Sequence, residues 1–149
     1  MKKLINILFF TFAVTLSAQQ IDYNTDDGYV AEGYDVTEYF NNKAVEGKSN
    51  YVTSHDNVKY KFATQANLEK FKSNPGKYVP KYGGYCSYAL ATKADKVDID
   101  PETFEINDGR LYLFYNSWGT NTHKKWKAEG AEKLKPKADA NWEKIKTKK

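Results

Sequence analysis

Cys86 is the residue whose chemistry most needs an explanation, because it is the only cysteine in this chain of 149 residues. A thiolate can coordinate a soft metal ion, act as a nucleophile or redox group, or stay protonated as a small buried side chain. The other soft donors are His55 and His123, since Met1 belongs to a segment that we expect to be removed. The three lie far apart in sequence. Only the fold could therefore bring them together around a copper or zinc ion.

The sequence contains no complete catalytic motif. A cysteine nucleophile needs a base beside it, usually oriented by a third group. Cys86 with His123 is conceivable, but no spacing marks the two as partners. The chain also lacks a Cys-x-x-Cys pair, a serine nucleophile elbow and a phosphate-binding glycine loop. We therefore expect a binding module rather than an enzyme, with catalysis left open.

The thiol lies in an unusual stretch of tyrosine and glycine, residues 78–89. The pair Gly83-Gly84 allows the backbone and aromatic rings to approach closely, which ordinary helices and strands do not require. The tyrosines fit simple packing as well as chemistry. Tyr82, Tyr85 and Tyr60 are our candidates for lining a pocket around the thiol.

The first 18 residues have the layout of a secretory signal peptide. Two lysines precede an apolar run from Leu4 to Leu16, which closes on Ser17 and Ala18. The run is shorter than the about 20 residues that span a membrane, which disfavours the alternative of an N-terminal anchor. We expect a mature chain from about Gln19 that is exported to the periplasm or beyond the cell. After processing it should have no transmembrane segment.

The mature chain is long enough for one compact domain and too short for two. We place a domain at residues 31–146. Residues 19–30 are polar and lack periodicity, which indicates a leader that is flexible unless it docks. Residues 147–149 form a basic tail.

Two β-hairpins are predicted from short β-rich runs on either side of turn residues. The first covers 51–62 with a turn at Asp56-Asn57, and the second covers 103–115 with a turn at Asn107-Asp108-Gly109. In the second hairpin, leucines at 111 and 113 alternate with aromatic residues at 112 and 114, so we expect both of its faces to be covered.

Helical spacing predicts three to four short helices. They comprise one turn after Asp35, a helix that Thr64 caps, a segment around 123–128, and a final helix to about Ile145. Hairpins followed by helices indicate an α+β domain. We expect the two hairpins to form a small antiparallel sheet packed with these helices.

Four motifs, in a fixed order, distinguish the chain. They are Gly-Tyr-Asp-Val-x-x-Tyr-Phe at 33–40, Val-x-Tyr-x-Phe-Ala at 58–63, Tyr-Gly-Gly-Tyr-Cys at 82–86, and Asp-Gly-x-Leu-Tyr-Leu-x-Tyr-Asn at 108–116. In this order they resemble the YHS-domain family, in its longer, exported, stand-alone form. The resemblance covers roughly residues 31–145.

The resemblance implies a metal-binding module associated with heavy-metal and copper handling. The short form of the family carries paired cysteines after the first hairpin, where this chain has Ala63 and Thr64. The usual ligands are therefore absent, and Cys86 remains in the motif that the long form shares. The resemblance implies the fold throughout, but a copper or zinc ion only through Cys86.

Charge is distributed unevenly along the chain, whose net charge is +4. The segment 124–149 holds ten lysines and four acidic residues, whereas residues 19–123 hold 11 basic and 15 acidic residues. Such a basic segment can attract anionic polymers or lipid headgroups, or it can simply be a solvated helix face with a lysine tail. Nothing indicates sequence-specific nucleic-acid binding.

These observations predict an exported, non-catalytic binding module that holds a soft metal ion through Cys86. The first alternative is a structural or interaction domain with a buried Cys86 and an unknown protein partner. The second is a thiol redox protein.

Overall fold

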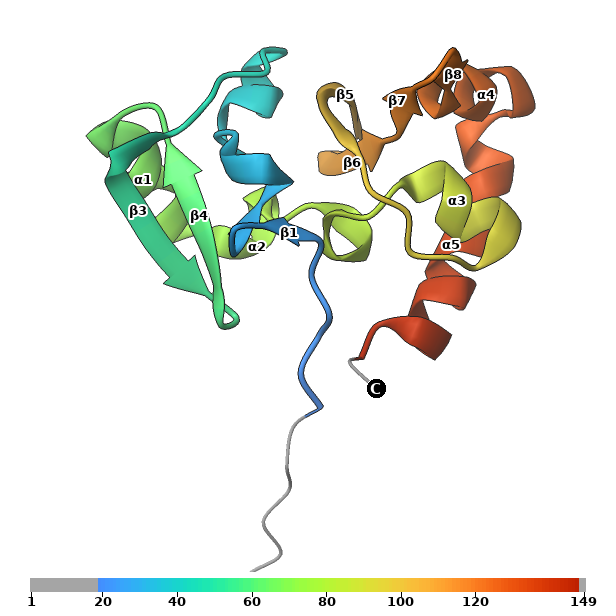
Figure 1. The fold of residues 1–149 in the computed structure, drawn as a ribbon, viewed down its shortest axis with the longest axis horizontal. Helices are drawn as coiled ribbons and strands as arrows, with labels where there is room; N and C mark the ends of the chain where they lie inside the picture. The colour runs from blue at the N-terminus through green and yellow to red at the C-terminus, as the bar shows by residue number, and fades with distance from the viewer. Residues whose placement is uncertain (1–18, 148–149) are drawn as a thin grey trace, which may run out of the picture.

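The computed structural model describes residues 19–147, which form a mixed α+β architecture (Figure 1). The predicted α+β class is confirmed, and the predicted signal peptide lies outside the described residues. The strands are β1 (Thr25–Asp26), β2 (Tyr29–Val30), β3 (Lys48–His55), β4 (Val58–Phe62), β5 (Asp100–Asn107), β6 (Arg110–Phe114), β7 (Asn116–Ser117) and β8 (Thr120–Asn121). The α-helices are α1 (Gln65–Ser73), α2 (Pro75–Tyr78), α3 (Ser87–Lys93), α4 (Thr122–Glu129) and α5 (Ala131–Ile145), with 3-10 turns at Ala31–Gly33, Glu38–Asn41 and Lys81–Gly84.

One side of the molecule is a four-stranded sheet with α1 packed against it (Figure 1). Strands β3 and β4 form the first predicted hairpin, around a turn in which Asp56 and Asn57 both have positive φ. Tyr60 and Phe62 of β4 pack on Phe71 of α1, with ring centroids 4.6 and 5.2 Å apart. The predicted cap of α1 is confirmed by the bond from the Asn67 amide to the Thr64 hydroxyl.

The second predicted hairpin, β5–β6, forms a sheet of its own, which differs from the single small sheet that we expected. The free edge of β4 is occupied by β2, which pairs with it in parallel through Tyr29 and Lys59. The strand order β1-β2-β4-β3 thus leaves no edge of β4 for β5 or β6. A segment expected to be outside the domain takes the place of the second hairpin.

Strand β6 divides the hydrophobic interior into two cores. Leu111 and Leu113 belong to the first core, which reaches from the four-stranded sheet and α1 to Cys86, whereas Tyr112 and Phe114 belong to the second. The second core is built mainly from helices α3, α4 and α5, and Trp126 is fully buried within it. The prediction that both faces of this hairpin are covered is therefore confirmed.

The segment expected to be a flexible leader is docked on the domain. Tyr23 and Val30 are buried, and the backbone amide of Asp22 donates to the Lys146 carbonyl at 2.7 Å. Ile21 forms an isolated β-bridge with Thr147, so the two ends of the described chain lie side by side (Figure 1). The body of the domain therefore begins before residue 31 and includes the first residue of the predicted tail.

Within residues 19–147, no helix has the length and apolar character needed to span a membrane. The longest helix, α5, has 15 residues and buries Leu134 and Ala138 against the second core.

Candidate functional site

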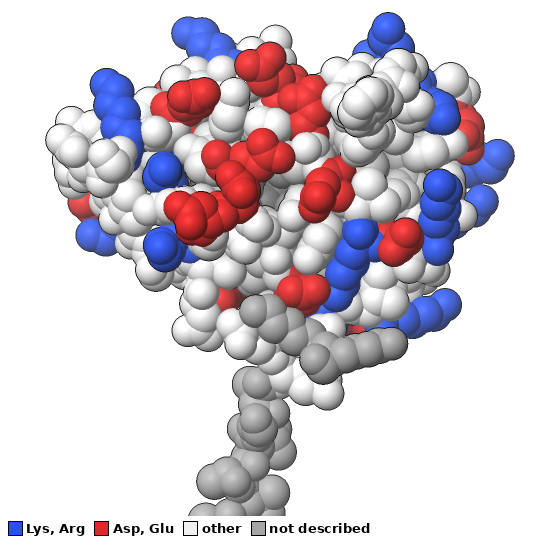
Figure 2. Space-filling view, in the orientation of Figure 1, with Lys and Arg blue, Asp and Glu red and all other residues white. Residues whose placement is uncertain are grey.

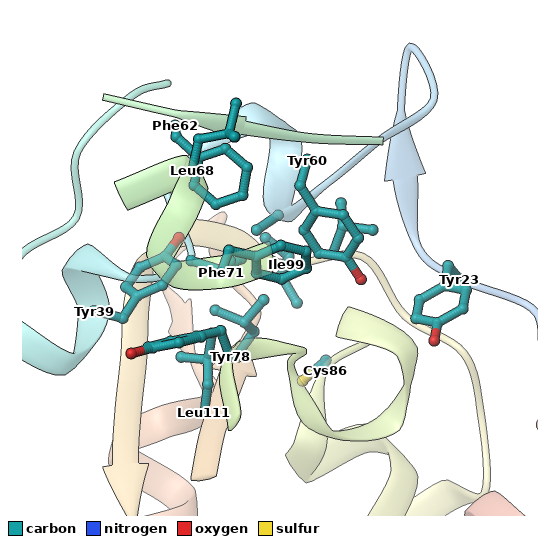
Figure 3. Packing of buried hydrophobic residues seen from close by; sticks show 14 of the residues in the cluster. Tyr23, Tyr39, Tyr60, Phe62, Leu68, Phe71, Tyr78, Cys86, Ile99 and Leu111 are labelled. Carbon is teal, nitrogen blue, oxygen red and sulfur yellow. The ribbon is translucent and has the colours of Figure 1, made fainter. Parts of the chain in front are cut away.

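Cys86 precedes the first residue of α3 and is fully buried. Its backbone is held from two sides, because its amide donates to the Val97 carbonyl at 2.9 Å and its carbonyl accepts from the Leu90 amide at 3.1 Å. Its side chain lies at the edge of the first core, apart from Tyr60 and Tyr23 (Figure 3). The position of the sulfur is therefore fixed by the fold.

The thiol has two hydrogen-bond partners, one that donates to its sulfur and one that accepts its proton. The backbone N–H of Tyr115 donates to Cys86 Sγ at 3.4 Å, and Thr122 Oγ1 lies 3.3 Å from the same sulfur. The single hydroxyl proton of Thr122 is donated to the Tyr115 carbonyl at 2.8 Å. The thiol is consequently the donor to Thr122 Oγ1. This arrangement fits a neutral, buried thiol.

A pocket of about 570 Å³ lies beside this thiol. Its volume falls in the range of small-molecule sites. Cys86, Ala89 and Val97 are the apolar residues of its wall, and Tyr115 and Thr122 also line it. Cys86 lies just beneath the pocket surface, because none of the residue is exposed to solvent. The sulfur is therefore part of the floor rather than of the open surface.

The rim of the pocket is basic. Lys93, at the end of α3, and Lys125, on α4, both line it and both are exposed. Neither lysine forms an ion pair with a described residue. Tyr88 also lines the pocket, and its hydroxyl donates to Glu129 at 2.6 Å, which raises the Tyr88 pKa. The described lining includes no carboxylate.

A second hollow, of about 320 Å³, has the opposite charge. It is lined by Asp26, Glu32 and Asp98, and burial, followed by the nearby Asp26, Asp100 and Asp98, raises the Glu32 pKa. Figure 2 shows acidic side chains gathered at the centre of this face and basic ones around its edges. An anionic molecule would be repelled here and attracted to the rim at Lys93 and Lys125.

The predicted pocket-lining tyrosines lie elsewhere, so this part of the prediction is corrected. Tyr60 is buried in the first core on Phe71, and Tyr82 is buried in the second core with its hydroxyl on Asp139. The Tyr85 hydroxyl donates to Asp22 at 3.3 Å, and burial, followed by that carboxylate, raises the Tyr85 pKa to about 12.

The tyrosines beside the thiol are Tyr88 and Tyr115. The residues at 89, 92 and 93 that share the pocket with Cys86 are spaced as one side of a helix. A prediction of residues 87–93 as a helix would have placed these pocket residues on the same side as Cys86.

The two histidines are held by other partners. His123 Nε2 lies 2.9 Å from Glu105 Oε2, its ring stacks on Phe114, and its hydrogen bond lowers the Glu105 pKa. His55 lies on the opposite side of the fold, against Phe71 and 3.6 Å from Asp56 Oδ2. Neither ring is a hydrogen-bond partner of Cys86.

The donor set does not fit a metal centre. Among the described residues, no group of three or more His, Cys, Asp or Glu side chains is arranged to hold a metal ion. The atoms that bond Cys86 Sγ are a hydroxyl oxygen and a backbone amide, whereas copper(I) prefers sulfur and imidazole. The soft-metal site stays a prediction that this geometry does not support.

In the folded protein, Cys86 should react with a disulfide reagent such as DTNB at least about a hundredfold more slowly than in denaturant, because reaction requires local opening. The rate is read from the absorbance of the released thiolate in native buffer and in guanidinium chloride. Cys86→Ser provides the blank. Equal rates in the two solutions would contradict the buried placement and favour a reactive thiol.

No family model matches the chain, and neither does any curated protein or solved structure. The resemblance to the YHS-domain family therefore rests on the quoted motifs alone.

Proposed function

We propose that this chain is an exported, non-catalytic binding module whose site is the pocket beside Cys86. Its ligand is a small organic anion with an apolar body. The observation that carries this proposal is the pocket itself, about 570 Å³ in volume, with apolar floor and lysine rim in one place. Sites for small molecules typically combine such an apolar wall with a few polar groups that fix orientation.

The chemistry of the wall supports an anionic ligand. The rim lysines, Lys93 and Lys125, have no described carboxylate partner, so their ammonium groups are available to a ligand. Ala89, Val97 and Cys86 supply the surface against which an apolar body would pack.

The absence of a base beside the thiol supports binding rather than catalysis. Among the described residues, Cys86 Sγ bonds only Thr122 and the Tyr115 amide, and His123 is paired with Glu105. A cysteine nucleophile needs a base within hydrogen-bond reach. The buried Cys86 then has a structural role, as in the first alternative from the sequence.

Calorimetry on residues 19–149 tests the proposal. The ligands are aliphatic and aromatic carboxylates of about eight to twelve carbon atoms, and each is compared with the alcohol of the same carbon skeleton. A carboxylate should bind more tightly than its alcohol, and the double variant Lys93→Glu, Lys125→Glu should lose about tenfold or more of that affinity. The matched control is Lys48→Glu, Lys70→Glu, which makes the same charge change on the sheet side.

Thr92→Trp, at the exposed rim, should block the pocket without entering either core. Binding that survives both this variant and the rim double variant would contradict the proposed site. Failure of every carboxylate to bind would overturn the anionic ligand.

A copper(I) titration of the wild-type protein and of the Cys86→Ser variant separates the metal hypothesis from this proposal. One bound equivalent that disappears in the variant would favour a metal module. Equal binding by both proteins would leave the thiol with a structural role.

A further inference from the structure

Trp118 is exposed to an extent that packing does not explain. The residue is 95% exposed and is the one large hydrophobic side chain of the described residues in this state. It lies at the tip of the short hairpin formed by β7 and β8, beside α4 (Figure 1). Single exposed apolar residues are common on protein surfaces. The backbone conformation at Trp118 is a second reason to look for a role of this side chain.

Trp118 occupies a backbone conformation that disfavours a large side chain. Its φ is +49°, in the left-handed region where Asn, Asp and Gly are the usual residues. Among residues 19–147, the hairpins β1–β2, β3–β4 and β5–β6 turn at Asp27-Gly28, Asp56-Asn57 and Asp108-Gly109, each with positive φ at both residues. All three begin with aspartate. Of these four hairpin turns, the one at Trp118-Gly119 begins with a large aromatic residue. Tyr82 also has positive φ, but it lies outside the hairpins and its ring is buried.

The hairpin that carries Trp118 is firmly attached to the body. The Asn116 side-chain amide donates to Asp100 Oδ2 at 3.0 Å and to Thr103 Oγ1 at 3.1 Å. On the other strand, the Asn121 side chain accepts from the Lys124 amide at 3.0 Å and thereby caps α4. The tip is thus a convex projection with a supported base.

The helix that follows this projection carries three exposed lysines. Helix α4 buries Trp126 and turns Lys124, Lys125 and Lys127 to solvent. None of these three lysines forms an ion pair with a described residue. Lys125 lines the same pocket as Thr120, two residues after Trp118, so this lysine and the hairpin share one region of the surface. Lys124 and Lys127 follow on the same helix, which begins directly after β8.

We propose that this region docks on an anionic lipid surface, with the Trp118 indole in the interface and the α4 lysines on the headgroups. Tryptophan favours membrane interfaces because its ring is apolar while its N–H remains hydrated. Lysines beside it add attraction to anionic headgroups. A single projecting ring fits a soft, deformable surface better than a rigid protein face, which would need a pocket shaped for it. This inference does not depend on the ligand of the Cys86 pocket.

Vesicle sedimentation tests the proposal with residues 19–149, which contain every element of the described fold. Wild-type protein should bind vesicles of phosphatidylglycerol and phosphatidylcholine and should be released by salt. Trp118→Asn keeps a residue suited to positive φ and should weaken binding about tenfold while leaving thermal stability unchanged or higher. Lys124→Glu, Lys125→Glu, Lys127→Glu should weaken it about a hundredfold or more.

The matched control is Lys43→Glu, Lys48→Glu, Lys70→Glu, which makes the same change in net charge at exposed positions away from α4. Tryptophan fluorescence gives a second readout, since Trp126 is buried and Trp142 is half-buried. A blue shift on vesicles that is lost in Trp118→Asn supports insertion of the indole. Absent vesicle binding, or equal losses in the control and α4 variants, would overturn the proposal, as would unchanged binding by Trp118→Asn.

Discussion

Replacing Asp35 with alanine is expected to destabilise the fold by at least about 3 kcal/mol, because several buried donors lose their acceptor at once. Asp35 is fully buried. Its Oδ1 accepts from the Thr37 amide at 2.9 Å and the Thr37 hydroxyl at 2.8 Å. Its Oδ2 accepts from the Ala63 amide and the Asn67 side-chain amide, both at 2.8 Å.

These bonds join three separate parts of the chain. The carboxylate links the turn that precedes Glu38–Asn41 with the end of β4 and the first turn of α1. From the sequence we expected only a helical turn after Asp35, and a role at that turn accounts only for its bonds to Thr37. The two long-range bonds explain why the whole sheet side should depend on this residue.

Chemical denaturation monitored by circular dichroism measures the effect. Asp95→Ala is the matched control, because Asp95 is exposed and should change the free energy of unfolding by no more than about 0.5 kcal/mol. A similar, small effect for Asp35→Ala would show that its buried bonds are replaced by water.

Gly83→Ala is expected to cost at least about 2 to 3 kcal/mol, the second large effect. Gly83 has φ of +61°, and a Cβ there would lie 2.7 Å from the Asp22 carbonyl oxygen and 2.9 Å from the Trp142 ring. The backbone of Asp22 is held by Lys146 and cannot easily move away. The substitution should therefore loosen both the N-terminal segment and α5.

The neighbouring glycine provides the comparison. Gly84 also has positive φ, but a Cβ there would meet its nearest atom at 3.5 Å. Gly84→Ala should cost about 1 kcal/mol, from backbone strain alone. The difference between the two variants is read from thermal unfolding. Equal destabilisation would mean that strain, and not contact with Asp22 and Trp142, governs this motif.

The features that were predictable from the sequence depend on neighbouring residues. The turns at Asp56-Asn57 and Asp108-Gly109 and the Thr64 cap each follow from side chains a few positions apart. The alternation along β6 likewise revealed that both of its faces are buried. Local chemistry was sufficient for these elements because each is specified within one hairpin or one helical turn.

The features that were missed depend on distant contacts. The placement of residues 19–30 rests on pairing of β2 with β4 and of Ile21 with Thr147, which no local pattern announces. Helix α3 has seven residues and follows Cys86, whose amide is held by Val97 from a later loop. Without that helix, the residues around the thiol could not be identified.

The candidate site was thus predicted in part. Cys86 does lie beside a pocket, but its lining comes from α3, α4 and the end of the second hairpin rather than from Tyr82, Tyr85 and Tyr60. The aromatic-rich motif at 82–86 has a structural role. The Tyr82 hydroxyl donates to Asp139 of α5, and the Tyr85 hydroxyl donates to Asp22 of the N-terminal segment.

The bridge between Ile21 and Thr147 has a consequence for the order in which the chain folds. A ribosome delivers the N-terminal residues first, yet the partners of Ile21 and of the Asp22 amide, Thr147 and Lys146, lie at the far end of the described chain. Ile21 and the Asp22 amide must therefore wait for these partners while the rest of the domain assembles. Their pairing is a late step of folding, and until it occurs this end of the described chain lacks its backbone partner and remains open to proteases and chaperones.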